Sequence, residues 1–316
     1  MMNEKMTKFG LVRKQMRQQA KNYHDEIVPL SEVSFDSLDA VRIGSDEYRL
    51  RTMAGQGMAA RLRVPYQYLC RCPAGLQAQN LNYWVEKQKE NASDLFIRFD
   101  GDEVRSVLSR KFIPIDNLQI VEEMASLGQI TDDADVQCYQ DDRFMMLNIP
   151  SPDKKFALLK KDEMMPGVSI SNSEVGLASF SVAAFMLRLI CTNGMISKHH
   201  IEKSSYRHVS TTVLKQLPTI LQNATTNLDL IQHSMKSALK VKFEEPEEML
   251  LTLNDQYLLG ENQRQAVDWA WPQEKGNSLF NIMQTYTKAS QFETLSTQDR
   301  FRLQEVGGEI LYTANS

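Results

Sequence analysis

The longest weakly charged stretch of the chain runs from Val168 to Met195. Its apolar run, Val182 to Ile190, predicts a strand that is buried on both faces or enters a covered sheet. The Asn193-Gly194 pair favours a two-residue hairpin turn, because both positions tolerate positive φ. We therefore expect a central β-hairpin in which Arg188 faces His199.

The same stretch admits a helical interpretation. Ser171 followed by Glu174 fits a capping box, which would start a helix at the apolar run. The strand is favoured over this helix. The polar segments at the two ends, Asn172–Gly176 and Arg188–Gly194, are expected to meet in space, with both glycines at turns where a side chain would strain the backbone.

A second hairpin is predicted by Leu95–Phe99, the turn pair Asp100-Gly101, and a return strand to Leu108. Pairing of Phe99 with Asp102 sorts the side chains into two faces. A core face then gathers Leu95, Ile97, Phe99, Val104 and Leu108, and the opposite face gathers Phe96, Arg98, Glu103, Arg105 and Val107. The arginines either contact a ligand there or form ion pairs, Arg98 with Glu103, and Arg105 buried against Glu103 or Glu174.

Elsewhere the apolar spacing predicts a helix over 53–69 broken by Pro65, a helix over 116–127, and a hairpin around Asp141-Asp142. Further helices are expected over 211–240, 247–259, 261–270, 277–289 and 296–312. The pattern predicts an α+β fold rather than alternating βαβ units. We expect an antiparallel sheet with a β-β-α hairpin core packed by helices, followed by an all-α C-terminal region.

Three parts are predicted along the chain: a basic N-terminal arm (1–26), an α+β core domain (27–210) and a helical C-terminal region (211–316). The arm is either a short amphipathic helix, with Phe9, Val12 and Met16 near one face, or a frayed and solvated segment.

The composition, 42% hydrophobic and 24% charged, is that of an ordinary globular protein. No segment approaches the uncharged apolar length of a membrane span, and the N-terminus has no secretory pattern. We therefore expect a cytoplasmic protein without membrane partners, in the host cytoplasm if it is phage-encoded. The net charge of −4 argues against a uniformly basic nucleic-acid binder, but residues 1–23 and 198–215 are locally basic.

The sequence gives little support for a metal site or a cofactor site. Cys70 and Cys72 are too close for a zinc-type pair, and no second pair exists. His199 and His200 would point to opposite faces of a strand, so at most one of them could join His208. No phosphate loop, nucleophile elbow or paired-carboxylate spacing occurs. We expect no metal site and no cofactor.

Four segments together resemble a phage- and plasmid-borne family known as a domain of unknown function, DUF932. They are RSVLSRKFIPID (105–116), NSEVG (172–176), RLICTNGM (188–195) and Arg207-His208. The motif positions are Asn172, Ser173, Glu174, Gly176, Asn193 and Gly194, and the likeness extends from Ile27 to Leu311. The resemblance implies a mobile-element setting and an α+β fold, with no settled activity. The β-β-α-β layout is also distantly similar to single-strand annealing recombinases, by analogy of topology alone.

Three functions follow as hypotheses. The first is a nucleic-acid-binding module, a homo-oligomer that holds or anneals single-stranded DNA, with Tyr206 or Phe112 stacking on bases. Its candidate contacts are Arg98, Arg105, Arg110, Lys111, Arg188, Lys198, Lys203, Arg207 and His208. The alternative is a non-catalytic structural or host-interaction protein of a mobile element. The third is a hydrolase or nuclease that uses Glu174, Asp116 and His208.

Overall fold

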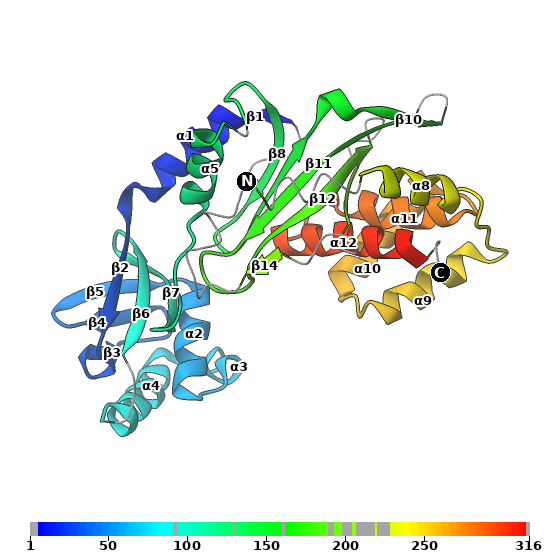
Figure 1. Cartoon of the computed structure of the whole chain (residues 1–316). Helices are drawn as coiled ribbons and strands as arrows, with labels where there is room; N and C mark the ends of the chain where they lie inside the picture. The colour runs from blue at the N-terminus through cyan, green and yellow to red at the C-terminus, as the bar shows by residue number, and fades with distance from the viewer. Residues whose placement is uncertain are drawn as a thin grey trace.

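The protein was analysed as a computed structural model of the whole chain. The structure describes residues 6–90, 94–128, 130–159, 162–188, 193–197, 204–206, 219 and 228–313. Within these ranges the fold is α+β, with two mainly antiparallel sheets and a helical C-terminal part (Figure 1). The predicted fold class is confirmed.

The first lobe is built on a six-stranded sheet, counted over the described residues, with strand order β2-β6-β7-β5-β4-β3. Its strands are β2 (Tyr23–Val28), β3 (Val33–Phe35), β4 (Ala40–Ile43), β5 (Asp46–Leu50), β6 (Leu95–Asp100) and β7 (Glu103–Ser109). The helices α2 (Thr52–Leu62), α3 (Tyr66–Leu69) and α4 (Ala74–Gln88) lie on one face of this sheet (Figure 1). Their apolar side chains and those of the strands form one core.

The second lobe is built on an eight-stranded sheet of the described residues, with the path β1-β8-β9-β11-β12-β13; β10 pairs with β11, and β14 pairs with β12. These strands are β1 (Thr7–Lys8), β8 (Asp135–Gln140), β9 (Met145–Pro150), β10 (Phe156–Leu159), β11 (Asp162–Asn172), β12 (Phe180–Arg188), β13 (Asn193–Ser197) and β14 (Ser204–Tyr206). Alternate residues of β12 join two different apolar clusters, so this strand is buried on both faces.

Helices cover the second lobe on two sides. Near β8 lie α1 (Phe9–Gln19) and α5 (Asn117–Ser126), and α1 buries Phe9, Val12 and Met16. The C-terminal helices gather at the β13 end of the sheet (Figure 1). They are α8 (Leu228–Ala238), α9 (Pro246–Gln256), α10 (Glu261–Glu274), α11 (Leu279–Ala289) and α12 (Thr297–Thr313).

The N-terminal segment is helical rather than frayed. Arg13 and Arg17 of α1 form ion pairs with Glu122 of α5, and Arg13 also pairs with Asp132. The chain then enters β2, which pairs with β6 of the first lobe. Of the two interpretations of the arm, the amphipathic helix is correct. The boundaries placed at residues 26 and 210 stay predictions.

The strand assignment of the central stretch is confirmed, and the helix starting at Ser171 is wrong. The predicted turn is also wrong, because Asn193 and Gly194 lie within β13, where Asn193 pairs with Arg188. Ser171 pairs with Ser181 at one end of β12, while Met164 pairs with Arg188 at the other. Seven residue steps of extended chain, ~23 Å, separate these ends. The expectation that the two polar segments meet in space is therefore wrong.

The β6–β7 hairpin is confirmed with a corrected register. Asp100 pairs with Glu103 and Phe99 with Val104, so the turn lies one residue later than predicted, with Gly101 at φ +58°. Arg98 pairs with Ser106, which leaves Arg105 as the extra residue of a β-bulge. Beyond the bulge the faces exchange, so Val107 rather than Leu108 joins the core.

Candidate functional site

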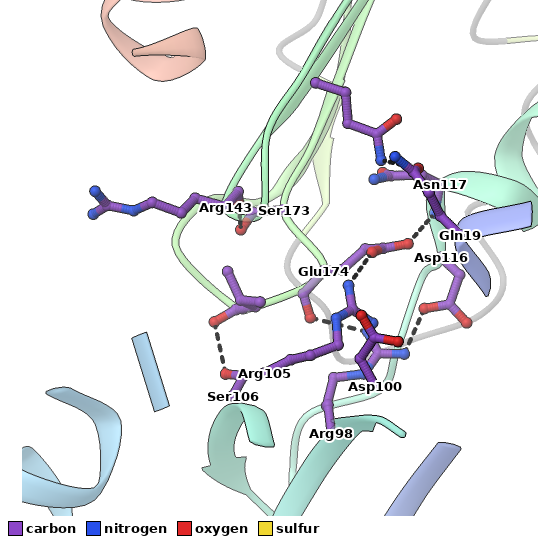
Figure 2. A network of polar contacts seen from close by, with 12 residues as sticks. Gln19, Arg98, Asp100, Arg105, Ser106, Asp116, Asn117, Arg143, Ser173 and Glu174 are labelled. Carbon is purple, nitrogen blue, oxygen red and sulfur yellow. Dashed lines mark hydrogen bonds and ion pairs between the residues drawn. The ribbon is translucent and has the colours of Figure 1, made fainter. Parts of the chain in front are cut away.

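The turn after β11 joins the two lobes. Residues 173–176 of this turn lie against the face of the β6–β7 hairpin that is opposite to the helices (Figure 2). Gly176 has φ +80°, and a Cβ built there would come within 2.7 Å of Leu108 Cδ2. Glycine is therefore required at this position by both backbone conformation and space.

Arg98 is held at the centre of this junction, with 2% of its surface exposed. Its Nε donates to Asp25 of β2 at 2.9 Å, and its Nη2 donates to Asp116 at 2.5 Å. Its Nη1 donates to the carbonyl oxygen of Glu174 at 2.9 Å. Burial by itself would lower the pKa of Arg98, but the charge of Asp116 and the contacts with Asp25 raise that pKa above its ordinary value.

Arg105 and Glu174 form a buried ion pair, with 3% and 8% of their side chains exposed. Arg105 Nη2 donates to Glu174 Oε2 at 2.5 Å, and the guanidinium lies 3.5 Å from the centroid of the Tyr23 ring. Glu174 Oε1 accepts from the backbone N–H of Asn117 at 2.8 Å. Glu174 thus supplies a negative charge to the N-terminus of α5, where helix dipole and free N–H groups favour it.

The β-bulge explains why two successive hairpin residues reach the same turn. While Arg105 contacts the Glu174 carboxylate, Ser106 Oγ donates to the carbonyl oxygen of Val175 at 3.2 Å. Asp116 occupies the N-cap position of α5 but makes no capping bond, because its carboxylate pairs with Arg98. Glu174, from another element, therefore provides the cap of α5.

The remaining motif residues fix the turn itself. Asn172 Nδ2 donates to the carbonyl oxygen of Ile115 and to Asn117 Oδ1, both at 2.8 Å. Ser173 Oγ donates to the carbonyl oxygen of Arg143 at 2.7 Å and accepts from the N–H of Leu177. The inter-lobe network, as we call Asp25, Arg98, Arg105, Asp116 and Glu174, is thus braced from the second lobe by neutral hydrogen bonds.

The geometry indicates that the inter-lobe network has a structural role. Both carboxylate oxygens of Glu174 accept hydrogen bonds from groups of the protein itself, Arg105 and the backbone N–H of Asn117, and the side chain is buried. Three carboxylates surround two guanidinium groups, which neutralises the positive charge that a phosphate would need. Arg98 and Arg105 do lie on the face of the hairpin opposite the first-lobe core, as expected, but the second lobe covers that face, so it is not open to a ligand strand.

The other predicted contacts do not gather around this network. Arg110 is exposed and pairs with Asp94 at 2.9 Å, and the adjacent Lys111 is exposed. Arg188 is 15% exposed, pairs with Glu274 at 2.7 Å and lies over the ring of Phe280. The remaining four predicted contacts, Lys198, Lys203, Arg207 and His208, lie outside the described residues.

Sequence reasoning missed Asp25, Ser106 and Asn117 as members of the junction. Asp25 is separated from Arg98 by 73 positions, and no short motif links them. The available signal was indirect: a hairpin that carries two arginines on one face needs either solvent or carboxylates opposite it.

A family model described as a domain of unknown function, DUF932, matches residues 105–303, which is more than half of the chain. The chain belongs to the DUF932 family. The matched region starts at Arg105 and includes Glu174, while Arg98, Asp25 and α2–α4 precede it. A search of curated proteins and a search of solved structures each gave no significant match.

The described residues of the DUF932 protein contain neither a membrane-spanning helix nor a cluster of metal ligands. No helix there has both the length and the apolar composition needed to cross a membrane. No group of three or more His, Cys, Asp or Glu side chains in those residues is arranged to hold a metal ion.

One surface of the first lobe differs in charge from the chain as a whole. The helical layer from Thr52 to Gln88 contains the cations Arg61, Arg63, Arg71 and Lys87 against the single acid Glu86, whereas the whole chain has a net charge of −4. Among the described residues, Arg63, Arg71 and Lys87 have no ion-pair partner. Glu86 pairs with Lys89 instead.

Proposed function

We propose that this DUF932 protein is a non-catalytic nucleic-acid-binding protein of a mobile genetic element, acting in the cytoplasm of the host cell in replication or recombination. The observation that carries the proposal is the basic helical layer α2–α4 on a chain whose net charge is −4. Local clustering of cations, rather than net charge, produces a phosphate-binding surface.

The proposed role, nucleic-acid binding, is the one expected from the sequence, but the residues proposed to contact phosphates are different. Arg98 pairs with Asp25 and Asp116, and Arg105 pairs with the buried Glu174, so both guanidinium charges are already neutralised and do not contribute phosphate contacts. Arg63, Arg71 and Lys87 replace them, because their charges are not neutralised by acids among the described residues.

A salt titration tests the proposed function. Binding of labelled DNA and RNA oligonucleotides is measured by fluorescence anisotropy at several salt concentrations. We expect the logarithm of the affinity to fall linearly with the logarithm of salt concentration, and Arg71→Ala to reduce the slope on a single strand by about 0.7. Arg110→Ala serves as the control, because Arg110 is already paired with Asp94. Absence of salt-dependent binding to every nucleic acid tested would rule the proposal out.

A second candidate function, self-assembly, is favoured by the end of α9. Leu258 is 86% exposed and has φ +53°, a left-handed conformation in which glycine is far less strained. Leu251 on the same helix is 62% exposed. The left-handed backbone of Leu258 closes the end of α9, where the N–H of Leu259 donates to the carbonyl oxygen of Asn254. The exposed side chains of Leu251 and Leu258 are not used by the fold and suit a contact with a second copy of the chain.

The assembly candidate predicts that Leu258→Gly lowers the average mass in light scattering while leaving the melting temperature unchanged or higher, because glycine relieves the strain. A wild-type protein that remains monomeric at every concentration would exclude this second candidate.

A further inference from the structure

The outward face of α4 carries a stripe of large side chains. Leu76, Asn80, Tyr83, Trp84 and Lys87 fall within about 100° of one another around the helix at 3.6 residues per turn. The stripe covers about 17 Å of the helix from Leu76 to Lys87. It lies opposite Leu81 and Val85, the residues that α4 buries in the first-lobe core. The core therefore does not account for the aromatic residues of the stripe.

These aromatic side chains are unusually exposed for their size. Tyr83 is 55% exposed and Trp84 is 41% exposed, and Leu76 beside them is 39% exposed. The rings of Tyr83 and Trp84 lie edge to face with centroids 5.3 Å apart, and Lys87 Nζ is 5.7 Å from the centroid of Tyr83. Two adjacent rings with a cation beside them form a platform on which a flat, electron-rich ring can stack.

Cations continue past the N-terminal end of the stripe. Gln77 of α4 donates to the carbonyl oxygens of Leu69 and Cys72, which fixes the end of α3 against α4. This contact brings the exposed Arg71, together with Tyr68 at 46% exposure, to the start of α4. The acid of α4, Glu86, pairs with Lys89 rather than with Lys87. The platform is thus bordered by positive charge.

The combination of stacking rings and bordering cations matches a chain of bases linked by phosphates. A second copy of this chain could occupy the same face only if it presented acidic residues to Arg71 and Lys87 and apolar residues to the two rings. In a duplex the bases are already stacked on one another and their faces are hidden, so only an unpaired strand offers them to Tyr83 and Trp84.

We infer that the outer face of α4 is a base-stacking platform for single-stranded nucleic acid, in which Tyr83 and Trp84 stack on bases while Arg71 and Lys87 contact phosphates. The inference rests on the proposed function and extends it, because it names the strandedness of the ligand and the residues that select it. The platform lies at the end of the molecule away from α9–α12 (Figure 1).

The inference is tested with oligothymidylate, a blunt duplex of the same length, and an abasic oligonucleotide that keeps the phosphates. The wild type should bind oligothymidylate most tightly. Tyr83→Ala and Trp84→Ala should each weaken that binding about 5-fold to about 150-fold and leave binding to the abasic strand unchanged. Tyr83→Phe, which keeps the ring, should retain wild-type affinity.

Trp269→Ala is the matched control, because Trp269 is 39% exposed and also has a lysine, Lys288, over its ring. It should bind as the wild type does. A variant with Trp269→Phe and Trp271→Phe retains Trp84 as its sole tryptophan, and its fluorescence should be quenched by oligothymidylate and not by the abasic strand.

The outcomes separate the inference from the proposed function. If the wild type binds oligothymidylate and the Tyr83 and Trp84 variants bind equally well, the platform is wrong while the proposed function stands. Absence of binding to every strand overturns both. If Trp84→Ala changes the mass in light scattering without changing affinity, the face contacts a second copy and the platform is again wrong.

Discussion

At the scale of single residues, the inter-lobe network depends on Arg105. Its guanidinium is buried away from water, and one carboxylate, that of Glu174, balances its positive charge. We predict that Arg105→Ala lowers the free energy of unfolding by about 3–5 kcal/mol, because it leaves Glu174 buried and unpaired. Urea denaturation measures this change. Arg110→Ala, which removes a pair that is 55% and 36% exposed, should cost less than about 1 kcal/mol. Equal effects of the two substitutions would contradict a structural role for the buried pair.

A substitution at Gly176 tests how much the turn contributes to the stability of the same junction. Gly176→Ala should destabilise the protein by more than about 1 kcal/mol, because φ is +80° and the new methyl group would meet Leu108. Gly44→Ala is the control for backbone strain alone, since φ is +60° there and no atom lies within 4 Å of the new Cβ. If both variants lose the same stability in thermal denaturation, the contact with Leu108 contributes nothing.

At the scale of elements, the docking of α1 on α5 depends on Glu122. Its carboxylate accepts from Arg17 Nε at 2.6 Å and from Arg13 Nη2 at 2.8 Å. Hydrogen bonds from Arg17, followed by those from Arg13, lower the pKa of Glu122 from 4.5 to about 2 in spite of partial burial. A depressed pKa in the folded state means that this stabilisation is complete above pH 4.5 and is lost as the pH falls through about 2.

We therefore predict that Glu122→Gln is less stable than the wild type at neutral pH, and that the two urea midpoints converge as the pH is lowered from 4.5 to 2. The side chain of Glu122 is 34% exposed, so solvent screening keeps the difference modest. A constant difference across the whole pH range would show that Glu122 stabilises α1 by packing rather than by charge.

Elements were predicted well from the sequence where one local pattern decides them. The strand β12, the hairpins β6–β7 and β8–β9 and the helices α9–α12 all follow from apolar spacing and turn residues. The register of β6–β7 was predicted wrongly, because a bulge at Arg105 follows from contacts with a distant turn. The burial of Arg98 was missed for the same reason: its carbonyl partner Glu174 lies 76 positions away, in the other lobe. Local patterns contain no information about such a partner.

At the scale of the whole molecule, each lobe has its own apolar core, and the inter-lobe network lies between them. The DUF932 match begins at Arg105, inside β7, so it includes most of the second lobe, without β1 and α1, and part of one strand of the first. That strand contributes both Arg105 and Ser106 to the junction. The family region therefore contains the ion pair of Arg105 with Glu174, while the partners of Arg98 come from both sides of the boundary.

The last prediction concerns the coupling of the two lobes. Arg98 makes two contacts with the second-lobe side, to Asp116 and to the carbonyl oxygen of Glu174, and a hydrogen bond to a charged group contributes about 1.5–3 kcal/mol. Arg98→Met keeps most of the side-chain volume and removes both. We expect calorimetric unfolding to change from one transition in the wild type to two in Arg98→Met, since each core can then melt independently. Arg51→Met is the control, because Arg51 pairs with Asp100 and Glu103 within the first lobe alone. A single transition in Arg98→Met, merely shifted to lower temperature, would contradict this prediction and mean that the contacts left in place, among them the pair of Arg105 with Glu174, couple the lobes.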